Sequence, residues 1–154
     1  MKKIEPIRHA CQNELEQIMA IYAAARAFMA ANGNEEQWGD GYPQKEILQE
    51  DLEKNQLYVY EEDGKIGAVF VFFIGKEPDY ETSVSGKWTS PKPYGVLHRI
   101  AVVTYGKRIA SKCIQWCYEQ CHCMRGDTGK KNKSMQRLFE KNGFTQCAMI
   151  HPWY

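Results

Sequence analysis

The stretch from Tyr94 to Cys121 holds the residues whose types and spacing are best suited to chemistry. It begins with an apolar, β-branched run at 96–103, which is typical of a strand covered on both faces. A turn at 105–106 follows, and apolar residues then recur at the spacing of one helical face. A turn that leads into a helix directs unpaired N–H groups and the positive end of a dipole at one spot. Because Lys107 and Arg108 lie in the same turn, the sequence predicts a cradle for a phosphorylated cofactor.

Length, charge and composition restrict the class of protein. The chain has 154 residues, the size of one domain, so we expect 1–154 to fold as a single unit. A net charge of +1 gives no general attraction to nucleic acid or anionic lipid, and neither is expected as a partner. The longest apolar run, 68–74, is far shorter than the ~20 residues that cross a membrane. The first residues lack the apolar segment of a signal peptide, so we expect a cytoplasmic protein whose six cysteines are thiols.

Turn and capping signals divide the chain into alternating strands and helices. Asn13 with Glu16 three residues later predicts the start of a helix. Asp63 followed by glycine, between two apolar runs, predicts a type I′ hairpin turn. Asn132 and Gly143 are expected to cap and to end the last helix. The predicted strands are 4–10, 57–61, 66–74, 96–103, 124–128 and 146–150, and the predicted helices are 13–32, 44–54, 133–142 and one from the turn after Gly106 to 121.

Three segments within this order of elements, β-α-α-β-β-β-α-β-α-β, carry a recognisable pattern. They are His98-Arg-Ile-Ala-Val102, the turn at 105–110, and Asn132 followed by Leu138-Phe-Glu-Lys-Asn-Gly-Phe144. They resemble the fourth strand, the pyrophosphate loop and the last helix and turn of the GNAT superfamily of acyl-coenzyme-A-dependent N-acetyltransferases. The resemblance covers nearly the whole chain. It implies an α/β (α+β) fold with a mixed, mostly antiparallel sheet, splayed central strands and flanking helices.

The chain departs from the family pattern in four places. The pyrophosphate loop has Tyr105 in place of Gln or Arg, and Arg108 in place of its central glycine, so the loop is degenerate. An arginine there either crowds the phosphates or pairs with them through charge-assisted hydrogen bonds. Phe139 stands where many members have a tyrosine that acts as general acid. Members usually continue into a seventh strand after the position of Tyr154; that strand is absent, lies outside this sequence, or is supplied by a partner such as a second copy in a homodimer.

The resemblance implies that acetyl-coenzyme A is the cosubstrate and that an amine attacks its thioester directly. The pantetheine arm would pair with the central strand where two strands splay apart, and the N–H of Val102 or a neighbour would stabilise the oxyanion. The implied contacts are the backbone of Ile100, Ala101 and Val102 and the side chain of Asn132 for the pantetheine arm, and the N–H groups of Lys107, Arg108, Ile109 and Ala110 for the pyrophosphate.

His98 is the first candidate for the base that takes the acceptor's proton. In a regularly alternating strand its side chain would lie on the same side as Ile100 and Val102, and the ordinary pKa of histidine suits neutral pH. A hydrogen-bonded interior imidazole is an alternative of at least equal weight. A thiolate can leave without a protein acid, so Phe139 does not exclude turnover.

Other residues have two open interpretations. Four aromatic residues would line the acceptor pocket by resemblance, or else anchor loops to the core: Trp38, Tyr42, Tyr80 and Trp88. Cys113, Cys117 and Cys121 repeat along one helical face, but zinc sites usually pair cysteines in C-x(2–4)-C units. We therefore expect no metal, and a cysteine face that packs on the sheet. The basic group at 130–141 is interpreted as a solvated helix face, with RNA or the cofactor's 3′-phosphate as alternatives.

Three hypotheses follow. The leading one is an N-acetyltransferase that acts on a primary amine of a small molecule or peptide. The second is a catalytically impaired protein of this fold that binds acyl-coenzyme A or a protein partner as a regulator. The third is a cysteine-based metal or redox protein.

Overall fold

The computed structural model describes residues 6–33, 41–75, 83–86, 94–103, 108–128, 132–144 and 148–150. No helix within these described ranges is long and apolar enough to cross a membrane. The elements of this part of the chain are, in order, β1 (Ile7–His9), the 3₁₀ helix η1 (Gln12–Glu14), α1 (Leu15–Ala31), α2 (Lys45–Glu53), β2 (Leu57–Glu62), β3 (Lys65–Ile74), β4 (Ser83–Gly86), β5 (Gly95–Val102), α4 (Ile109–Cys121), β6 (Met124–Arg125), α5 (Lys133–Lys141) and β7 (Ala148–Ile150).

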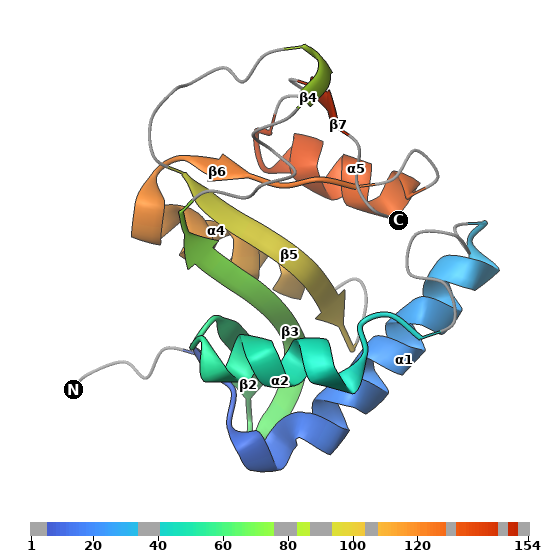
Figure 1. Ribbon diagram of the computed structural model, residues 1–154, viewed down its shortest axis with the longest axis vertical. Coiled ribbons are helices and arrows are strands. Elements are labelled where there is room, and N and C mark those ends of the chain that lie inside the picture. Colours follow the sequence, from blue (N-terminus) through green and yellow to red (C-terminus); the bar gives the residue numbers. More distant parts are fainter. Residues whose placement is uncertain are drawn as a thin grey trace.

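Five strands make one mixed sheet in the order β1-β2-β3-β5-β6. Neighbouring strands are antiparallel except β5 and β6, which run parallel. β4 and β7 pair separately as an antiparallel two-stranded sheet, which lies above the main sheet in Figure 1. The mixed, mostly antiparallel sheet with flanking helices confirms the predicted fold class.

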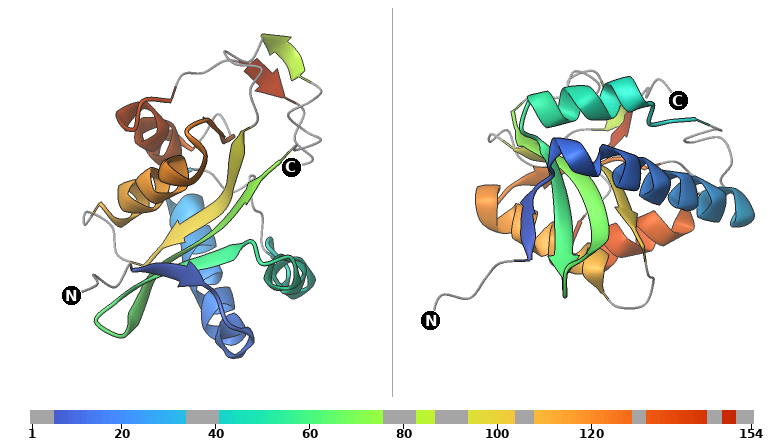
Figure 2. Two further views of the ribbon diagram at one scale, coloured as in Figure 1. Left: turned by 90° about the vertical axis from the view of Figure 1, so that its left-hand side faces the viewer. Right: turned by 90° about the horizontal axis from the view of Figure 1, so that it is seen from below.

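Two apolar layers enclose the main sheet. Helices α1 and α2 cover one face, and α4 and α5 cover the other (Figure 2). Alternate residues of β3 serve the two layers, because side chains of a strand point to opposite faces. Each fully buried aliphatic or aromatic side chain contributes roughly 1.5–3 kcal/mol. The first layer joins Ile18, Tyr22 and Leu48 to Val69, Val71 and Ala101, and the second joins Cys113, Ile114 and Cys117 to Ala68, Phe70 and Phe72.

The cysteine face of α4 packs on the sheet, as predicted. Cys113 and Cys117 are fully buried there, and burial raises the pKa of the Cys113 thiol to about 12. Both thiols are therefore held in the protonated form that neither attacks nor binds metal readily. Within the described ranges, no three His, Cys, Asp or Glu side chains gather as a metal site.

The local turn and cap signals are confirmed in most places. Asp63 and Gly64 have φ values of 54° and 75°, which the type I′ turn requires. The side-chain oxygen of Asn132 accepts a hydrogen bond from the N–H of Met135 at 3.2 Å and so caps α5. Gly143, with φ of 85°, ends that helix.

Strand β4 is not among the predicted elements, since residues 76–93 are polar and rich in turn formers. Its sequence, Ser-Val-Ser-Gly, holds a single apolar residue and gives no alternating pattern. The last predicted strand, 146–150, is observed as β7. Residues 151–154 lie outside the described residues, so the loss of a further strand stays a prediction.

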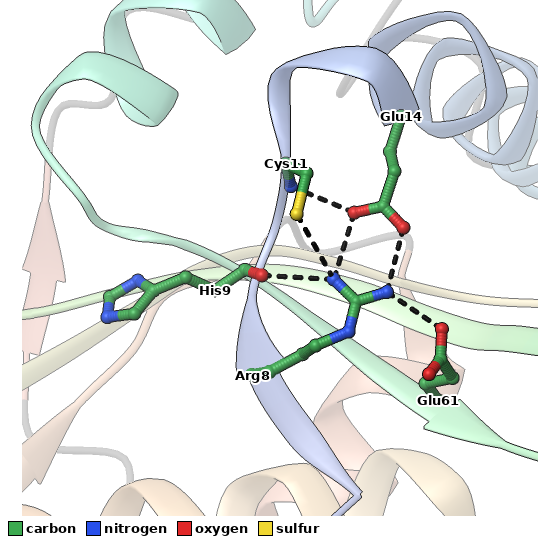
Figure 3. Close-up of polar contacts among 5 residues, drawn as sticks. All are labelled: Arg8, His9, Cys11, Glu14 and Glu61. Carbon is green, nitrogen blue, oxygen red and sulfur yellow. Dashed lines mark hydrogen bonds and ion pairs between the residues drawn. The ribbon is translucent and has the colours of Figure 1, made fainter.

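The start of the first helix differs from the prediction. The N–H of Cys11, not of Asn13, donates to a carboxylate, the Oε1 atom of Glu14, at 2.8 Å. That carboxylate is fixed by Arg8, whose Nη1 and Nη2 donate to its two oxygens at 2.9 and 2.8 Å (Figure 3). Arg8 Nη2 also donates to Glu61 in β2 at 2.7 Å. The predicted box of Asn13 with Glu16 is wrong because the cation in β1 places the cap on Glu14.

This cluster predicts a pH dependence of stability. Hydrogen bonds from Arg8 hold the pKa of Glu14 below its ordinary value. A depressed folded-state pKa adds stability that is present above the unfolded pKa of about 4.3 and is lost as the pH falls through the folded value. We expect Glu14→Gln to lower the free energy of unfolding at pH 7 and to flatten its decline below pH ~4.3, measured by urea unfolding at several pH values. Glu119→Gln, at an exposed position of α4, is the control; equal acid profiles for the two variants would contradict the assignment.

Candidate functional site

Strands β5 and β6 pair only at their first residues. Gly95 is opposite Met124 and Val96 is opposite Arg125, and the N–H of Gly95 donates to the carbonyl of Cys123 at 2.7 Å. β6 then ends, while β5 continues to Val102. From residue 97 onward, one edge of β5 therefore has no β6 partner in the register. The backbone of such an edge can pair with a ligand that lies along it like a further strand.

A β-bulge in β5 sets the direction of its backbone groups. The register with β3 shifts between Val69 and Val71, so that Arg99 and Ile100 together oppose Phe70. Arg99 has a φ of 49°, the left-handed region, inside a strand. An inserted residue of this kind resets the alternation of everything that follows it.

The alternation after the bulge identifies the groups that face the open edge. The N–H of Val103 donates to the carbonyl of Gly67 in β3 at 2.8 Å. Because N–H directions alternate along a strand, the N–H of Ala101 also points to β3, and those of Ile100 and Val102 point to the open edge. The N–H of Ala101 therefore points away from this edge, and the Ala101 side chain lies in the α1–α2 layer.

His98 lies on the opposite face of the sheet from the one expected. It opposes Val71, and its ring centroid is 6.0 Å from that of Phe73, both on the α1–α2 side. Ile100 and Val102 pack instead against the α4 layer. The expectation of a shared side is wrong, because it assumed unbroken alternation and the bulge adds a residue between them.

Asp127 is the charged neighbour of His98. Its Oδ1 atom lies 3.8 Å from Nδ1 of His98, and each side chain is about one-fifth exposed. The pair is therefore partly screened from water and still reachable. Asp127 lies within a predicted strand, but no sequence pattern indicates that it approaches His98.

Tyr42 contacts Arg99 on the same face. Arg99 Nη1 donates to the Tyr42 hydroxyl at 2.9 Å, and burial raises the pKa of that hydroxyl. Arg99 Nη2 donates to Asp51 of α2 at 2.5 Å. Sequence reasoning missed Arg99 and Asp51; the available signal was a carboxylate three residues after Leu48, on the apolar face of the predicted helix. Of the other predicted site residues, Trp38, Tyr80, Trp88 and Lys107 lie outside the described residues.

The N-terminus of α4 is close in sequence to the end of β5. Arg108 is its N-cap, with a φ of 59° in the left-handed region that favours glycine. Ile109 and Ala110 form the first turn, where N–H groups lack intrahelical partners. These N–H groups and an exposed guanidinium form a surface suited to phosphate.

Two residues with expected roles at the site, Asn132 and Phe139, lie in the α5 segment. Asn132 uses its side-chain oxygen to cap α5, so its amide nitrogen is the group that would reach a ligand. The Phe139 ring packs on Phe144, with ring centroids 4.8 Å apart. It also lies against Gly126, where an added Cβ would be 2.7 Å from the Phe139 Cζ atom. A ring without a hydroxyl thus lies against the residue that directly follows β6.

Comparison with known proteins decides the family. Residues 15–144 match the model of the acetyltransferase (GNAT) family. The chain belongs to this family. Its members use acyl-coenzyme A, which agrees with an open strand edge beside a helix N-terminus.

Solved acetyltransferase structures share the fold. A GNAT-family acetyltransferase from Streptococcus agalactiae is 32% identical, with a TM-score of 0.86 over 94% of this chain and 87% of that chain. A putative acetyltransferase from Staphylococcus aureus is 26% identical, with a TM-score of 0.69 over 91% of each chain. An aminoglycoside N-acetyltransferase in complex with coenzyme A has 17% identity and a TM-score of 0.63 over 96% of this chain and 92% of that chain, which shows a common fold. A search of curated proteins gave no significant match.

The left-handed conformation of Arg108 leads to a prediction. Arg108→Gly relieves a backbone conformation that costs roughly 1–2 kcal/mol for other residues, offset by about 0.4–1 kcal/mol of added chain entropy. We expect a net gain in stability of about 0.5–1 kcal/mol, and an affinity for coenzyme A, measured by calorimetry, that is kept or improved. Arg108→Asn is the matched variant, since asparagine tolerates the same φ without the charge. A large loss of affinity in both variants would mean instead that the guanidinium binds phosphate.

Proposed function

We propose that this GNAT protein is an N-acetyltransferase, a single GNAT-like domain that transfers an acetyl group from acetyl-coenzyme A to a primary amine of a small molecule or peptide by direct attack. The observation that carries the proposal is the open edge of β5, with ligand-directed N–H groups at Ile100 and Val102, next to the His98–Asp127 pair on the other face. One face would hold the coenzyme, and the other would receive the amine.

The coenzyme would be held mainly by backbone. The N–H groups of Ile100 and Val102 suit the pantetheine arm, and the start of α4 suits the pyrophosphate. The pyrophosphate loop would be a degenerate one, because Arg108 stands where the family pattern has its central glycine. When bound, acetyl-coenzyme A supplies an acetyl group activated as a thioester. The N–H of Val102 is then directed to the carbonyl oxygen that gains negative charge during attack.

His98 would take the proton of the incoming amine. A primary amine reaches the site as a cation, and Asp127 supplies the nearby negative charge that attracts it. The imidazole accepts the proton directly or through one water, which leaves the amine nucleophilic. The Asp127 carboxylate lies 3.8 Å from Nδ1 of this ring and is its charged neighbour.

The second candidate, a protein that binds acyl-coenzyme A as a regulator, is favoured by one observation. Phe139 presents a hydrocarbon ring to Gly126 and Phe144 at the position where many members supply a proton donor. Turnover in this chain therefore depends on a thiolate that leaves without that donor.

The experiment that separates the two mixes the purified protein with acetyl-coenzyme A and a panel of amines, and follows loss of the thioester absorbance. Turnover with at least one amine supports the enzyme. A rise in melting temperature with acetyl-coenzyme A but no turnover supports the regulator, because a ligand bound only to the folded state stabilises it. The absence of both effects would overturn acyl-coenzyme A binding.

The proposed role of His98 predicts a kinetic effect. We expect His98→Gln to lower kcat by about 10²- to 10⁴-fold, the usual contribution of a general base. The affinity for coenzyme A should stay within about twofold, because the ring lies on the opposite face from Ile100 and Val102. His9→Gln, on β1, is the control. Unchanged kcat in His98→Gln would show that the ring is an interior imidazole without a catalytic role.

A further inference from the structure

Arg99 is held in a conformation that its own backbone does not favour. Its φ of 49° lies in the left-handed region, and it interrupts β5, the strand between β3 and β6 in the sheet. Non-glycine residues persist in this region only where the surrounding structure holds them. The contacts around Arg99 should therefore come from elements that are themselves rigid.

Hydrogen bonds from the Arg99 side chain to Asp51 in α2 and to Tyr42, just before α2, hold that side chain in place. Nη2 donates to Oδ2 of Asp51 at 2.5 Å, and Nη1 donates to the hydroxyl of Tyr42 at 2.9 Å. Asp51 is only 3% exposed, and its other oxygen accepts from Nε2 of Gln56 at 2.9 Å. Burial disfavours the charge of Arg99, but Asp51, Tyr22 and Tyr42 outweigh it and the pKa of Arg99 stays above its ordinary value. The guanidinium is therefore a fixed cation.

A hydrogen bond from α1 holds the backbone of Arg99. The hydroxyl of Tyr22 donates to the Arg99 carbonyl at 2.7 Å. Tyr22 is fully buried, and burial raises the pKa of its hydroxyl, so the donor is never lost to ionisation. A buried hydroxyl needs a hydrogen-bond partner, and the Arg99 carbonyl is the partner of this one.

The bulge at Arg99 decides which amides face the open edge. Before it, the N–H of Gly75 donates to the carbonyl of Tyr94, and His98 opposes Val71. If this register continued without an extra residue, Ile100 would oppose Val69 and its N–H would point to β3. With the bulge, Ile100 and Val102 turn to the open edge instead.

We propose that Tyr22, Asp51 and Tyr42 form a clamp that holds the Arg99 bulge and so positions the coenzyme-binding edge of β5. The three are positioning residues, since they act through Arg99 and belong to the opposite face of the sheet from the coenzyme. The inference rests on the proposed function in one respect, that acyl-coenzyme A lies along this edge. The clamp couples the α1–α2 layer to an edge that it does not touch.

The test uses Tyr22→Phe, which removes one oxygen from the core. Amide exchange by ¹⁵N NMR without ligand should be about 3- to 10-fold faster at Ala101 and Val103, the amides that bond to β3 after the bulge, than in the wild-type protein. The dissociation constant for coenzyme A, from calorimetry, should rise by about the same factor. Ile18→Val, one turn earlier on α1 and fully buried, is the control: it lowers global stability but should leave both readouts unchanged once corrected for that loss.

The exchange rates and the coenzyme A affinity together test the clamp. Faster exchange at Ala101 and Val103 together with weaker binding supports the clamp. Unchanged exchange, or faster exchange with unchanged affinity, overturns it. If the wild-type protein binds no coenzyme A, the proposed function fails separately, and the exchange rates alone show whether Tyr22 holds the bulge. Tyr42→Phe should also speed the exchange at Ala101 and Val103 and weaken coenzyme A binding. It removes the hydroxyl that accepts from Arg99 and keeps the aromatic ring.

Discussion

The arrangement of the site depends on one inserted residue in β5. Arg99 and Ile100 together oppose Phe70, and from that point the backbone of β5 presents its other set of N–H groups to the edge beyond β6. Without the insertion, the amides of Ile100 and Val102 would be used inside the sheet. The end of β6 leaves the later residues of β5 without a β6 partner, and the bulge determines which N–H groups face that edge.

The same insertion separates two kinds of chemistry onto two faces. His98 and Arg99 lie on the α1–α2 face with Asp51, while Ile100 and Val102 have their side chains in the α4 layer. A histidine with a carboxylate partner thus faces one side, and a strand edge next to a helix N-terminus serves the other. In a GNAT protein, this geometry fits a coenzyme and an amine that approach the same strand from different directions.

Much of this fold could be predicted from sequence, because the decisive signals are local. The Asp63-Gly64 pair allows few turns other than type I′, and Asn132 and Gly143 bracket α5 by cap chemistry that needs no tertiary contact. The site was harder to predict, since it depends on contacts between distant segments. The face of His98 was mispredicted because no residue type signals a bulge at an arginine. Asp127 and Asp51 acquire their meaning only through partners far along the chain.

Amide exchange in the presence of saturating coenzyme A tests most directly whether the open edge of β5 binds the coenzyme. Exchange should slow at Ile100 and Val102, whose N–H groups face the open edge, and should be unchanged at Ala101 and Val103, whose N–H groups already bond to β3. Saturable binding of coenzyme A that leaves the exchange of Ile100 and Val102 unaltered would contradict binding at this edge.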